Sequence, residues 1–437
     1  MDGSNLVHDI AHGVAAPLAP QRRRFRFGRR SPASLPWYPG NRLELLENGE
    51  EYFPAVLAAI ASAEREVLVE TFILDEDRAG NALREALIAA AQRGVRVNLT
   101  FDHYGSPDLS PSFIDGMTEA GVLVRMFDPM PRFFGFRPNG FRRLHRKLVV
   151  VDDRIAFVGG INCSEDHYSD SGPDAKHDFA VRIEGPLVDP MRSFMRTAIA
   201  TRGTGEPWRL SPPPASVAGG GADALFVVRD NGRHARDIER HYKAAIRTAQ
   251  REIIIANAYF FPGLGLLRQL RKAARRGVKV TILVQGNPDV PLSLAASRWL
   301  YAYLTKGGVH IHEFCARPFH GKVAVIDDEW ATIGSSNLDP LSLAVNLEAN
   351  VVVRDRAFNT ALREKLAPLF DGDCKRVDCA SVQRRGWWRM LCSGLVFQFL
   401  GRFPRWSGLL PAHTPAVHLV RPKPLATAAA SASVNPA

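Results

Sequence analysis

The sequence lacks the features that would mark a membrane-spanning, secreted or metal-clustered protein. No window reaches the roughly 20 consecutive apolar residues that a spanning helix needs. The first 20 residues lack the basic start and apolar core of a signal peptide. The five cysteines are scattered, odd in number and without CxxC or metal-ligand spacing. We therefore expect free thiols in a reducing compartment, no metal or other cofactor, and a soluble or peripherally attached protein.

Acidic residues are also fewer than basic residues. The chain has 56 Lys and Arg residues against 45 Asp and Glu, a net charge of +11. This balance favours anionic partners, which include nucleic acid, acidic lipid headgroups and phosphorylated small molecules, but it does not choose among them. Apolar residues, by contrast, make up 46% of 437 residues. That is enough for two ordinary domains or one large pseudo-symmetric domain.

The chain contains one unit twice. Three pairs of segments match: 63–77 with 249–263, 90–102 with 273–285, and 121–127 with 307–314. In each copy a helical pattern ends at a glycine, Gly94 or Gly277, and a strand-like run follows. Strands that alternate with helices indicate βαβ units. We predict an α/β fold of two pseudo-twofold-related sandwich halves, with mixed, largely parallel sheets flanked by helices and one shared active site.

Composition divides the chain further. We predict a basic flexible arm at residues 1–40, a first half at 41–200, a Pro/Gly-rich linker at 201–224 and a second half at 225–372. Residues 373–437 should form an amphipathic membrane-associating segment with a disordered tail. The halves differ in length, because Gly94 to His145 spans 51 residues and Gly277 to His320 spans 43. The surplus lies in an aromatic and basic loop at residues 128–145.

The most informative feature is a repeated polar motif. His145, Lys147, Asp152, Gly159 and Asn162 recur as His320, Lys322, Asp327, Gly334 and Asn337, and the offsets from the histidine are identical in both copies. The two-residue period of a strand puts each histidine and its lysine on one face. If the halves pack face to face, two His-Lys-Asn sets surround one point.

Such a cluster is suited to a phosphate group. Lysine and asparagine side chains can hold non-bridging oxygens and stabilise developing negative charge. Histidine serves both as nucleophile and as acid or base near neutral pH. One histidine can therefore attack phosphorus while the other protonates the leaving oxygen, which explains why two copies are needed.

The pattern H-x-K-x4-D followed by G-G/S-x-N, present twice, resembles the phospholipase D superfamily. Within it, segments such as "FDHYGSPDLS", "HDFAVRIEGPLV" and "GSSNLDPLSLAVNLEANV" resemble bacterial cardiolipin synthases, especially the B-type. The resemblance runs from about residue 43 to residue 370.

This resemblance implies an enzyme, a phosphatidyltransferase. One histidine attacks phosphatidylglycerol, giving a phosphatidyl-histidine and glycerol. The other first acts as acid, then deprotonates a second phosphatidylglycerol to give cardiolipin, and no metal is required. By analogy we expect His145 to be the nucleophile and His320 the acid and base, although the sequence does not distinguish them.

Further roles follow by position in the family pattern. Glu348 resembles the acidic residue that orients its histidine, and Asp178 occupies the comparable place in the first half. We interpret Asp152 and Asp327 as holding the motif together. Ser335 and Ser336 either donate to phosphate or serve the turn.

Other polar residues allow plainer interpretations. We interpret five histidines as surface or satisfied side chains: His103, His167, His177, His310 and His312. Asp102 and Tyr104 stand at a predicted strand end. Substrate contact and turn formation explain these two residue types there equally well.

One segment bears on the partner. In residues 384–406, Trp387, Leu391, Leu395 and Phe399 recur every four residues among arginines. This pattern indicates an interfacial helix on anionic lipid, or else a helix docked on the protein's own core. The arginine-rich residues 21–30 are a solvated arm or a second basic contact. We expect phosphatidylglycerol and an anionic membrane surface as partners, on the cytoplasmic face of a bacterial cell membrane, with no nucleic acid and no obligate protein partner.

Three rival functions remain in view. A hydrolase would use water in place of the second lipid, with the same residues at phosphorus. A nuclease would suit the net charge, but the chain has no recognisable nucleic-acid-binding module. A catalytically idle scaffold would not need both His-Lys sets.

Overall fold

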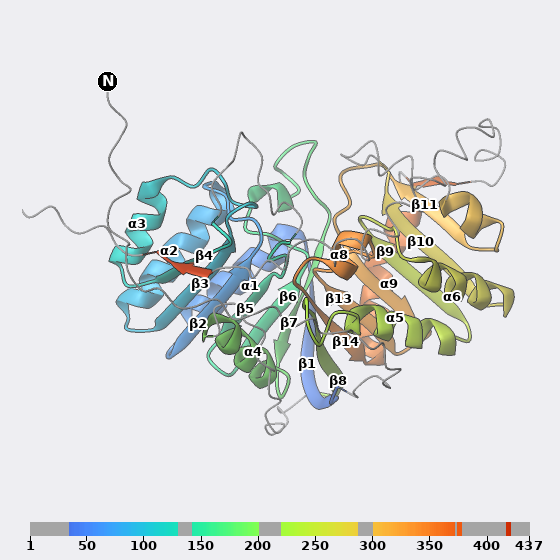
Figure 1. Ribbon diagram of the computed structural model, residues 1–437, viewed down its shortest axis with the longest axis horizontal. Coiled ribbons are helices and arrows are strands. Elements are labelled where there is room, and N and C mark those ends of the chain that lie inside the picture. The colour runs from blue at the N-terminus through green and yellow to red at the C-terminus, as the bar shows by residue number, and fades with distance from the viewer. Residues whose placement is uncertain are drawn as a thin grey trace, which may run out of the picture. The chain divides into compact units, whose positions relative to one another are not determined.

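The computed structural model describes residues 35–129, 142–200, 220–286, 300–371, 374–377 and 417–420. Within these ranges the two halves of the sequence form two copies of one arrangement (Figure 1). The first copy contains β1 (Tyr38–Glu47), α1 (Asn48–Ala61), β2 (Glu66–Thr71), α2 (Arg78–Gln92), β3 (Arg96–Asp102), α3 (Pro111–Glu119), β4 (Leu123–Phe127), β5 (Leu148–Val151), β6 (Ile155–Gly159), η1 (Glu165–His167), β7 (Phe179–Glu184) and α4 (Val188–Ala200). The second contains β8 (Ala222–Arg229), α5 (Asp237–Thr248), β9 (Glu252–Asn257), α6 (Leu264–Arg275), β10 (Lys279–Gln285), β11 (His310–Phe314), β12 (Lys322–Ile326), β13 (Trp330–Gly334), α8 (Pro340–Ala344), β14 (Glu348–Arg354) and α9 (Arg356–Asp371). Two short strands, β15 (Cys374–Arg376) and β16 (Val417–Leu419), pair with β11 and β4.

The strands of both copies join one sheet whose order is nearly the same from either end. That order is β15-β11-β10-β9-β12-β13-β14-β8-β1-β7-β6-β5-β2-β3-β4-β16. At its centre β1 and β8, the first strands of the two copies, pair antiparallel. The predicted pseudo-twofold relation between the halves is therefore confirmed, and it passes through this pair.

The sheet is mixed, as predicted, but the expectation that it is largely parallel was wrong. In the described part of the sheet only the β2–β3–β4 and β9–β10–β11 neighbours run parallel. The motif strands β5, β6, β12 and β13 pair antiparallel. Their connections, residues 152–154 and 327–329, are tight turns, whereas parallel neighbours need a crossover of about a dozen residues.

Three apolar clusters hold the helices on the sheet. Helices α1, α2 and α3 cover the outer face of the first copy, where Phe53 and Leu87 are buried against its strands. Helices α5 and α6 do the same in the second copy through Tyr242 and Leu267 (Figure 1). The third cluster joins the inner faces of both copies with α4 and α9. There β13 contacts β6 and β7, so the halves pack face to face and bring the ends of their motif strands together.

Several predicted features fall beyond these ranges. The basic residues 21–30, most of the linker and the segment 384–406 lie outside the described residues. The chain positions at which we divide the domains thus stay predictions. In the described ranges, no helix is both long and apolar enough to span a bilayer.

Candidate active site

Each histidine stands just before a short buried strand. His145 and Lys147 precede β5, whose residues are all Leu or Val, and His320 precedes β12, which starts at Lys322. In both copies the lysine Nζ donates to the carbonyl oxygen of its own histidine, at 2.8 Å for Lys147. The alternation of the strand thus folds each lysine back beside its histidine.

The backbone of each histidine is anchored by the opposite half. His145 N donates to Leu347 O at 3.0 Å, and Leu347 N donates to Arg143 O at 2.8 Å. The equivalent pair in the other direction joins His320 N to His177 O, and His177 N to Pro318 O, each at 2.8 Å. Because Glu348 follows Leu347 in the chain, this pairing places Glu348 next to His145. In the same way, Asp178 follows His177 and is placed next to His320.

Each half supplies the carboxylate that contacts the histidine of the other half. His145 Nδ1 lies 3.0 Å from Glu348 Oε2, and His320 Nδ1 lies 2.6 Å from Asp178 Oδ2. Because an ionised carboxylate only accepts, Nδ1 carries the proton in each ring and Nε2 is left to react. The family pattern led us to place each acidic residue beside a histidine, and the structure pairs each with the histidine of the other half.

Burial sets the electrostatics of this cluster. Desolvation lowers the pKa of Lys147 to about 7 and that of Lys322 to about 8. It likewise lowers the pKa of His145 and, further, that of His320. Burial also acts to raise the pKa of Glu348, but the nearby His145 and Lys147 side chains and the hydrogen bonds with His145 and Ser335 outweigh it, so its pKa is lowered. The histidines are then neutral near pH 7, as a nucleophile or base must be.

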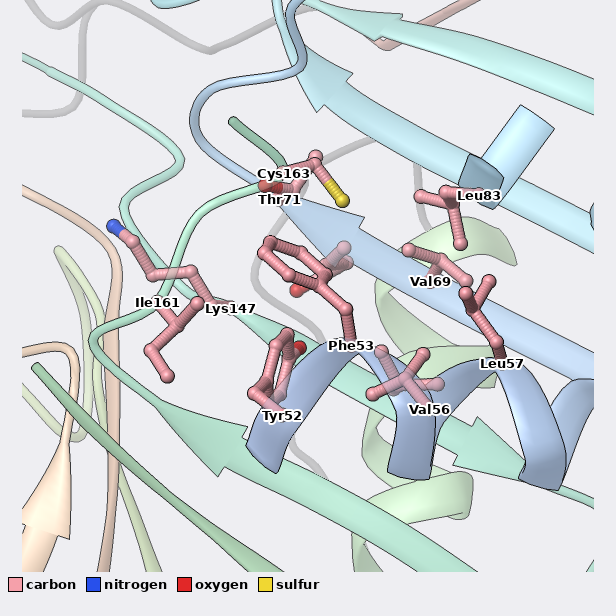
Figure 2. Close-up of a pocket in the computed structure, with 12 residues that line it drawn as sticks. Tyr52, Phe53, Val56, Leu57, Val69, Thr71, Leu83, Lys147, Ile161 and Cys163 are labelled. Atoms are coloured by element: carbon pink, nitrogen blue, oxygen red, sulfur yellow. The ribbon is translucent and has the colours of Figure 1, made fainter. Parts of the chain in front are cut away.

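The surroundings of Lys147 explain its desolvation. Behind its side chain lies an apolar cavity of about 10 Å³, lined by Tyr52, Phe53, Val149 and Ile161 among others. Figure 2 shows the Lys147 stem at the edge of this cluster, with its amino group turned away from Phe53. The stem packs on apolar side chains while the ammonium stays on the side of the histidines.

The asparagines and serines take different positions. Asn162 Oδ1 accepts from Ile73 N at 3.3 Å, whereas Asn337 Oδ1 is buried without a hydrogen-bond partner among the described residues. Ser335 Oγ donates to Glu348 Oε2. Ser336 is fully buried and its Oγ donates to the carbonyl of Asn337. Phosphate binding by Asn162, Asn337 or Ser336 stays a prediction.

The motif aspartates are not part of this cluster. Asp152 lies at the far end of β5, where its carboxylate accepts the backbone N–H groups of residues 64, 65 and 66 at 2.8–3.1 Å. Asp327 does the same for residues 250, 251 and 252. Both residues adopt a positive φ, 56° and 49°. This geometry supports the interpretation that they hold the motif together.

Asp102 and Tyr104, two further candidates from the sequence, contact the residues that precede His145. Asp102 accepts from Tyr104 N, Gly105 N and Leu144 N, so it closes its turn and steadies the residue before His145. Tyr104 is exposed, with the Arg143 guanidinium 3.3 Å from its ring centre.

Sequence reasoning missed His167. It is not a surface side chain but has no exposed area, and its ring centre lies 5.6 Å from that of His320. Among the described residues, His167, Asp178 and His320 form the one group of three donors close enough to consider for a metal ion. The signal that could have found His167 is a difference between the copies, because the position five residues after the motif asparagine is His167 in the first and Ser342 in the second. The connection that follows also differs in length. Asp178 follows Asn162 by 16 residues, while Glu348 follows Asn337 by 11.

A pseudo-twofold α/β fold with two HxKx4D motifs at one centre defines an enzyme of the phospholipase D superfamily. The family description "Cardiolipin synthase, PLD-like domain" matches residues 56–195 and 242–369. The chain therefore belongs to the phospholipase D-like cardiolipin synthase family.

Individual relatives agree with this membership. The cardiolipin synthase B of Salmonella typhi is 53% identical over 388 residues, covering 88% of this chain and 94% of that protein. The protein of the same name in Escherichia coli (strain K12) is 51% identical over the same shares. Cardiolipin synthase A of Pseudomonas putida (strain GB-1) is 31% identical, over 77% of this chain and 70% of its own. The phosphatidylserine synthase of Haemophilus influenzae Rd KW20 shares the fold, with a TM-score of 0.63 at 14% identity over 86% of this chain and 96% of that one.

Proposed function

We propose that this enzyme is a cardiolipin synthase that transfers a phosphatidyl group from one phosphatidylglycerol to another. The observation that carries the proposal is the pair of histidines with exchanged carboxylates in a chain 51–53% identical to cardiolipin synthases B. Each ring uses Nδ1 for its carboxylate, which leaves both Nε2 atoms for the reaction with a phosphodiester.

In the first step, His145 Nε2 attacks phosphorus. An N–P bond forms as the bond from phosphorus to the glycerol oxygen breaks, and His320 Nε2–H supplies the proton that this oxygen needs. The bound phosphate anion favours the protonated form of His320 and so offsets the effect of burial. Lys147, Lys322, Asn162 and Asn337 hold the non-bridging oxygens, where their charges and dipoles stabilise the transition state.

In the second step, His320 Nε2 removes the proton from a hydroxyl of a second phosphatidylglycerol. The resulting oxygen attacks phosphorus, the N–P bond breaks, and cardiolipin leaves with His145 restored. Hydrolysis would replace this lipid by water at the same residues. Transfer is favoured by the identity to cardiolipin synthases along most of the chain.

The substrate is a membrane lipid, so we also propose that the enzyme works at an anionic membrane surface. The net charge of +11 and the aromatic and basic segment at residues 384–406 support this. Peripheral attachment at the cytoplasmic face of a bacterial cell membrane is part of the same proposal, as is the absence of any requirement for nucleic acid or a protein partner.

The test is to incubate the purified protein with phosphatidylglycerol vesicles and identify lipid and soluble products by mass spectrometry. Cardiolipin with an equal amount of glycerol is expected. Phosphatidic acid and glycerol without cardiolipin would make the enzyme a hydrolase. His145→Ala and His320→Ala should each lose activity by about 100-fold or more, while His310→Ala, outside the cluster, serves as control.

A further inference from the structure

His167 stands on η1, five residues after Asn162, where the second half has Ser342 on α8, five residues after Asn337. The longer connection between Asn162 and Asp178 contains η1, which ends at His167. The imidazole has no exposed surface, and its ring meets that of His320 nearly edge-on, at 62°. A first-half residue thus packs directly on the motif histidine of the second half.

The hydrogen bonds of His167 fix its protonation. Its Nε2 accepts the backbone N–H of Asn162 at 3.1 Å, so the ring proton must sit on Nδ1. Burial lowers the pKa of His167 well below its ordinary value, which keeps this ring neutral. Nδ1 has no hydrogen-bond partner among the described residues. A buried donor without a partner costs free energy, so an ordinary packing role would be better filled by an apolar ring.

The two motif histidines therefore have different neighbours. His145 faces the ring of Phe72, with centres 5.0 Å apart. The position equivalent to Phe72 in the repeat is Ala258, which offers no ring to His320. An imidazole stands beside His320 and a phenyl ring beside His145, as two histidines with different tasks would need.

The same three residues do not make a ready metal cradle. One ring nitrogen of His167, one of His320 and a carboxylate oxygen of Asp178 lie within 4.8 Å of one another. However, His320 Nδ1 and Asp178 Oδ2 are 2.6 Å apart, the length of a strong hydrogen bond. Two ligands at about 2.0–2.1 Å from one tetrahedral ion lie more than about 3 Å apart. The geometry favours a hydrogen-bonded pair on which His167 acts.

We propose that His167 is a positioning residue for His320. Its neutral ring is held by the Asn162 backbone, packs on His320 and keeps the His320–Asp178 hydrogen bond oriented and dry, so that His320 can exchange protons with the leaving and entering oxygens. The proposal rests on the acid and base role proposed above for His320.

The experiment separates proton transfer from attack on phosphorus. A short-chain phosphatidyl ester with a p-nitrophenolate leaving group needs no acid, so its burst of nitrophenol reports attack by His145 alone, and the burst amplitude counts folded sites. Steady-state turnover of that ester and of dioctanoyl phosphatidylglycerol, normalised to this amplitude, reports the steps that need His320. We compare wild type with His167→Ala and His167→Gln, with His320→Ala as reference and His241→Ala on α5 as control.

For His167→Ala, the expected result is a burst rate within about threefold of wild type and a normalised turnover lower by about 10- to 100-fold, a part of what acid–base catalysis contributes. His167→Gln, which can still accept from Asn162, should recover part of the loss. An equal fall in burst and turnover, or no fall in either, would overturn the positioning role. Loss of the burst in His320→Ala would instead overturn the assignment of the two histidines, and no cardiolipin from wild type would overturn the proposed function.

Discussion

For Lys147 and Lys322, the proposed role in holding phosphate comes at the expense of stability. Lys147 and Lys322 are buried, and desolvation lowers their pKa values to about 7 and 8. An ammonium in such surroundings interacts more strongly with a phosphate than it would in water, because the effective dielectric constant is lower. The same desolvation disfavours the charged side chain while no phosphate is bound.

Replacing Lys147 by methionine should therefore lower activity and raise stability. Turnover should fall by about 100- to 1000-fold, as for removal of one transition-state donor. The lysine penalty is fully present below its folded pKa of about 7 and is relieved as pH rises toward the ordinary value of 10.5, so the gain in stability should be larger at pH 6.5 than at pH 9. The pKa shift of Lys147 sets an upper limit of about 5 kcal/mol on this gain in the free energy of unfolding. Denaturant unfolding at both pH values measures it, and a variant less stable at pH 6.5 would contradict the prediction.

The carboxylates are supported differently in the two halves. A Cβ on Gly160 would come within 2.4 Å of Asp178 Oδ1, so the short carboxylate needs a glycine beside it. The equivalent residue in the other half is Ser335, whose hydroxyl donates to the longer Glu348. The pair Gly160–Asp178 thus positions His320, and the pair Ser335–Glu348 positions His145.

Gly160→Ala should displace Asp178 from His320 and cost about 100-fold or more in turnover, the scale of acid–base catalysis. Ser335→Ala removes one donor to a charged acceptor and should cost about 10- to 100-fold. Turnover of cardiolipin formation, with folding checked by circular dichroism, compares the two. Near-normal activity in Gly160→Ala would mean that the carboxylate has room that the structure does not show.

At the scale of elements, the motif depends on two hairpins pinned at their turns. Asp152 ties the β5–β6 turn to the start of β2 by three backbone hydrogen bonds, and it adopts the left-handed conformation with φ 56°. Both features are independent of the histidine at the other end of β5.

Asp152→Ala should therefore destabilise the fold without touching the chemistry. Loss of these bonds to a charged acceptor should cost about 2–4 kcal/mol, and Asp152→Asn should cost less, because asparagine tolerates positive φ and keeps one acceptor. Thermal unfolding measures the loss. Turnover per folded site should stay within about twofold of wild type, and an inactive but fully folded Asp152→Ala protein would place Asp152 in the mechanism.

The hairpins also mark what sequence reasoning can reach. Identical offsets and the strand period suffice to bring His145 beside Lys147, because both depend on local geometry. They do not reveal that Glu348 serves His145, since that contact depends on how Leu347 crosses to residue 144 from the other half. They also do not reveal that His167 packs on His320, since that contact likewise crosses between the halves. The parallel share of the sheet was overestimated because the turns at residues 152–154 and 327–329 were not interpreted as hairpins.

At the scale of the whole molecule, the active site exists only while the halves stay together. Part of the contact between them is ionic, because Glu47 lies 2.8 Å from Lys365 on α9 of the second half. Within its own half, Glu47 also lies 2.9 Å from His177. Burial acts to raise the pKa of Glu47, but His177 and Lys365 outweigh it and hold the pKa at about 2. The Glu47 carboxylate thus stays charged in the folded protein well below its ordinary pKa.

Glu47→Gln should lower stability at neutral pH but not in acid. A depressed pKa contributes stability above the unfolded value of about 4.5, and this contribution is lost as pH falls from there through about 2. The difference in melting temperature between wild type and variant should stay constant from pH 7 to about pH 5 and shrink as the pH falls from about 4.5 toward about 2. Glu44→Gln, which breaks an exposed pair with Arg182 inside the first half, is the control. A constant difference at every pH would show that Glu47 acts by packing alone.

Access to substrate is the remaining property of the whole chain, since under the proposed function both lipids must reach His145 and His320 from a membrane. Trp387, Leu391, Leu395 and Phe399 lie outside the described residues, and their spacing among arginines predicts a helix that lies in the headgroup region of anionic lipid. Replacing Trp387 and Leu391 by serine should release the protein from phosphatidylglycerol vesicles in sedimentation and lower cardiolipin formation there by about tenfold or more, the effect of removing roughly 1.4 kcal/mol or more of binding free energy. Turnover of monodisperse dioctanoyl phosphatidylglycerol should stay normal, because the chemistry needs no surface. Equal losses on both substrates would indicate that this segment packs on the protein's own core instead of on lipid.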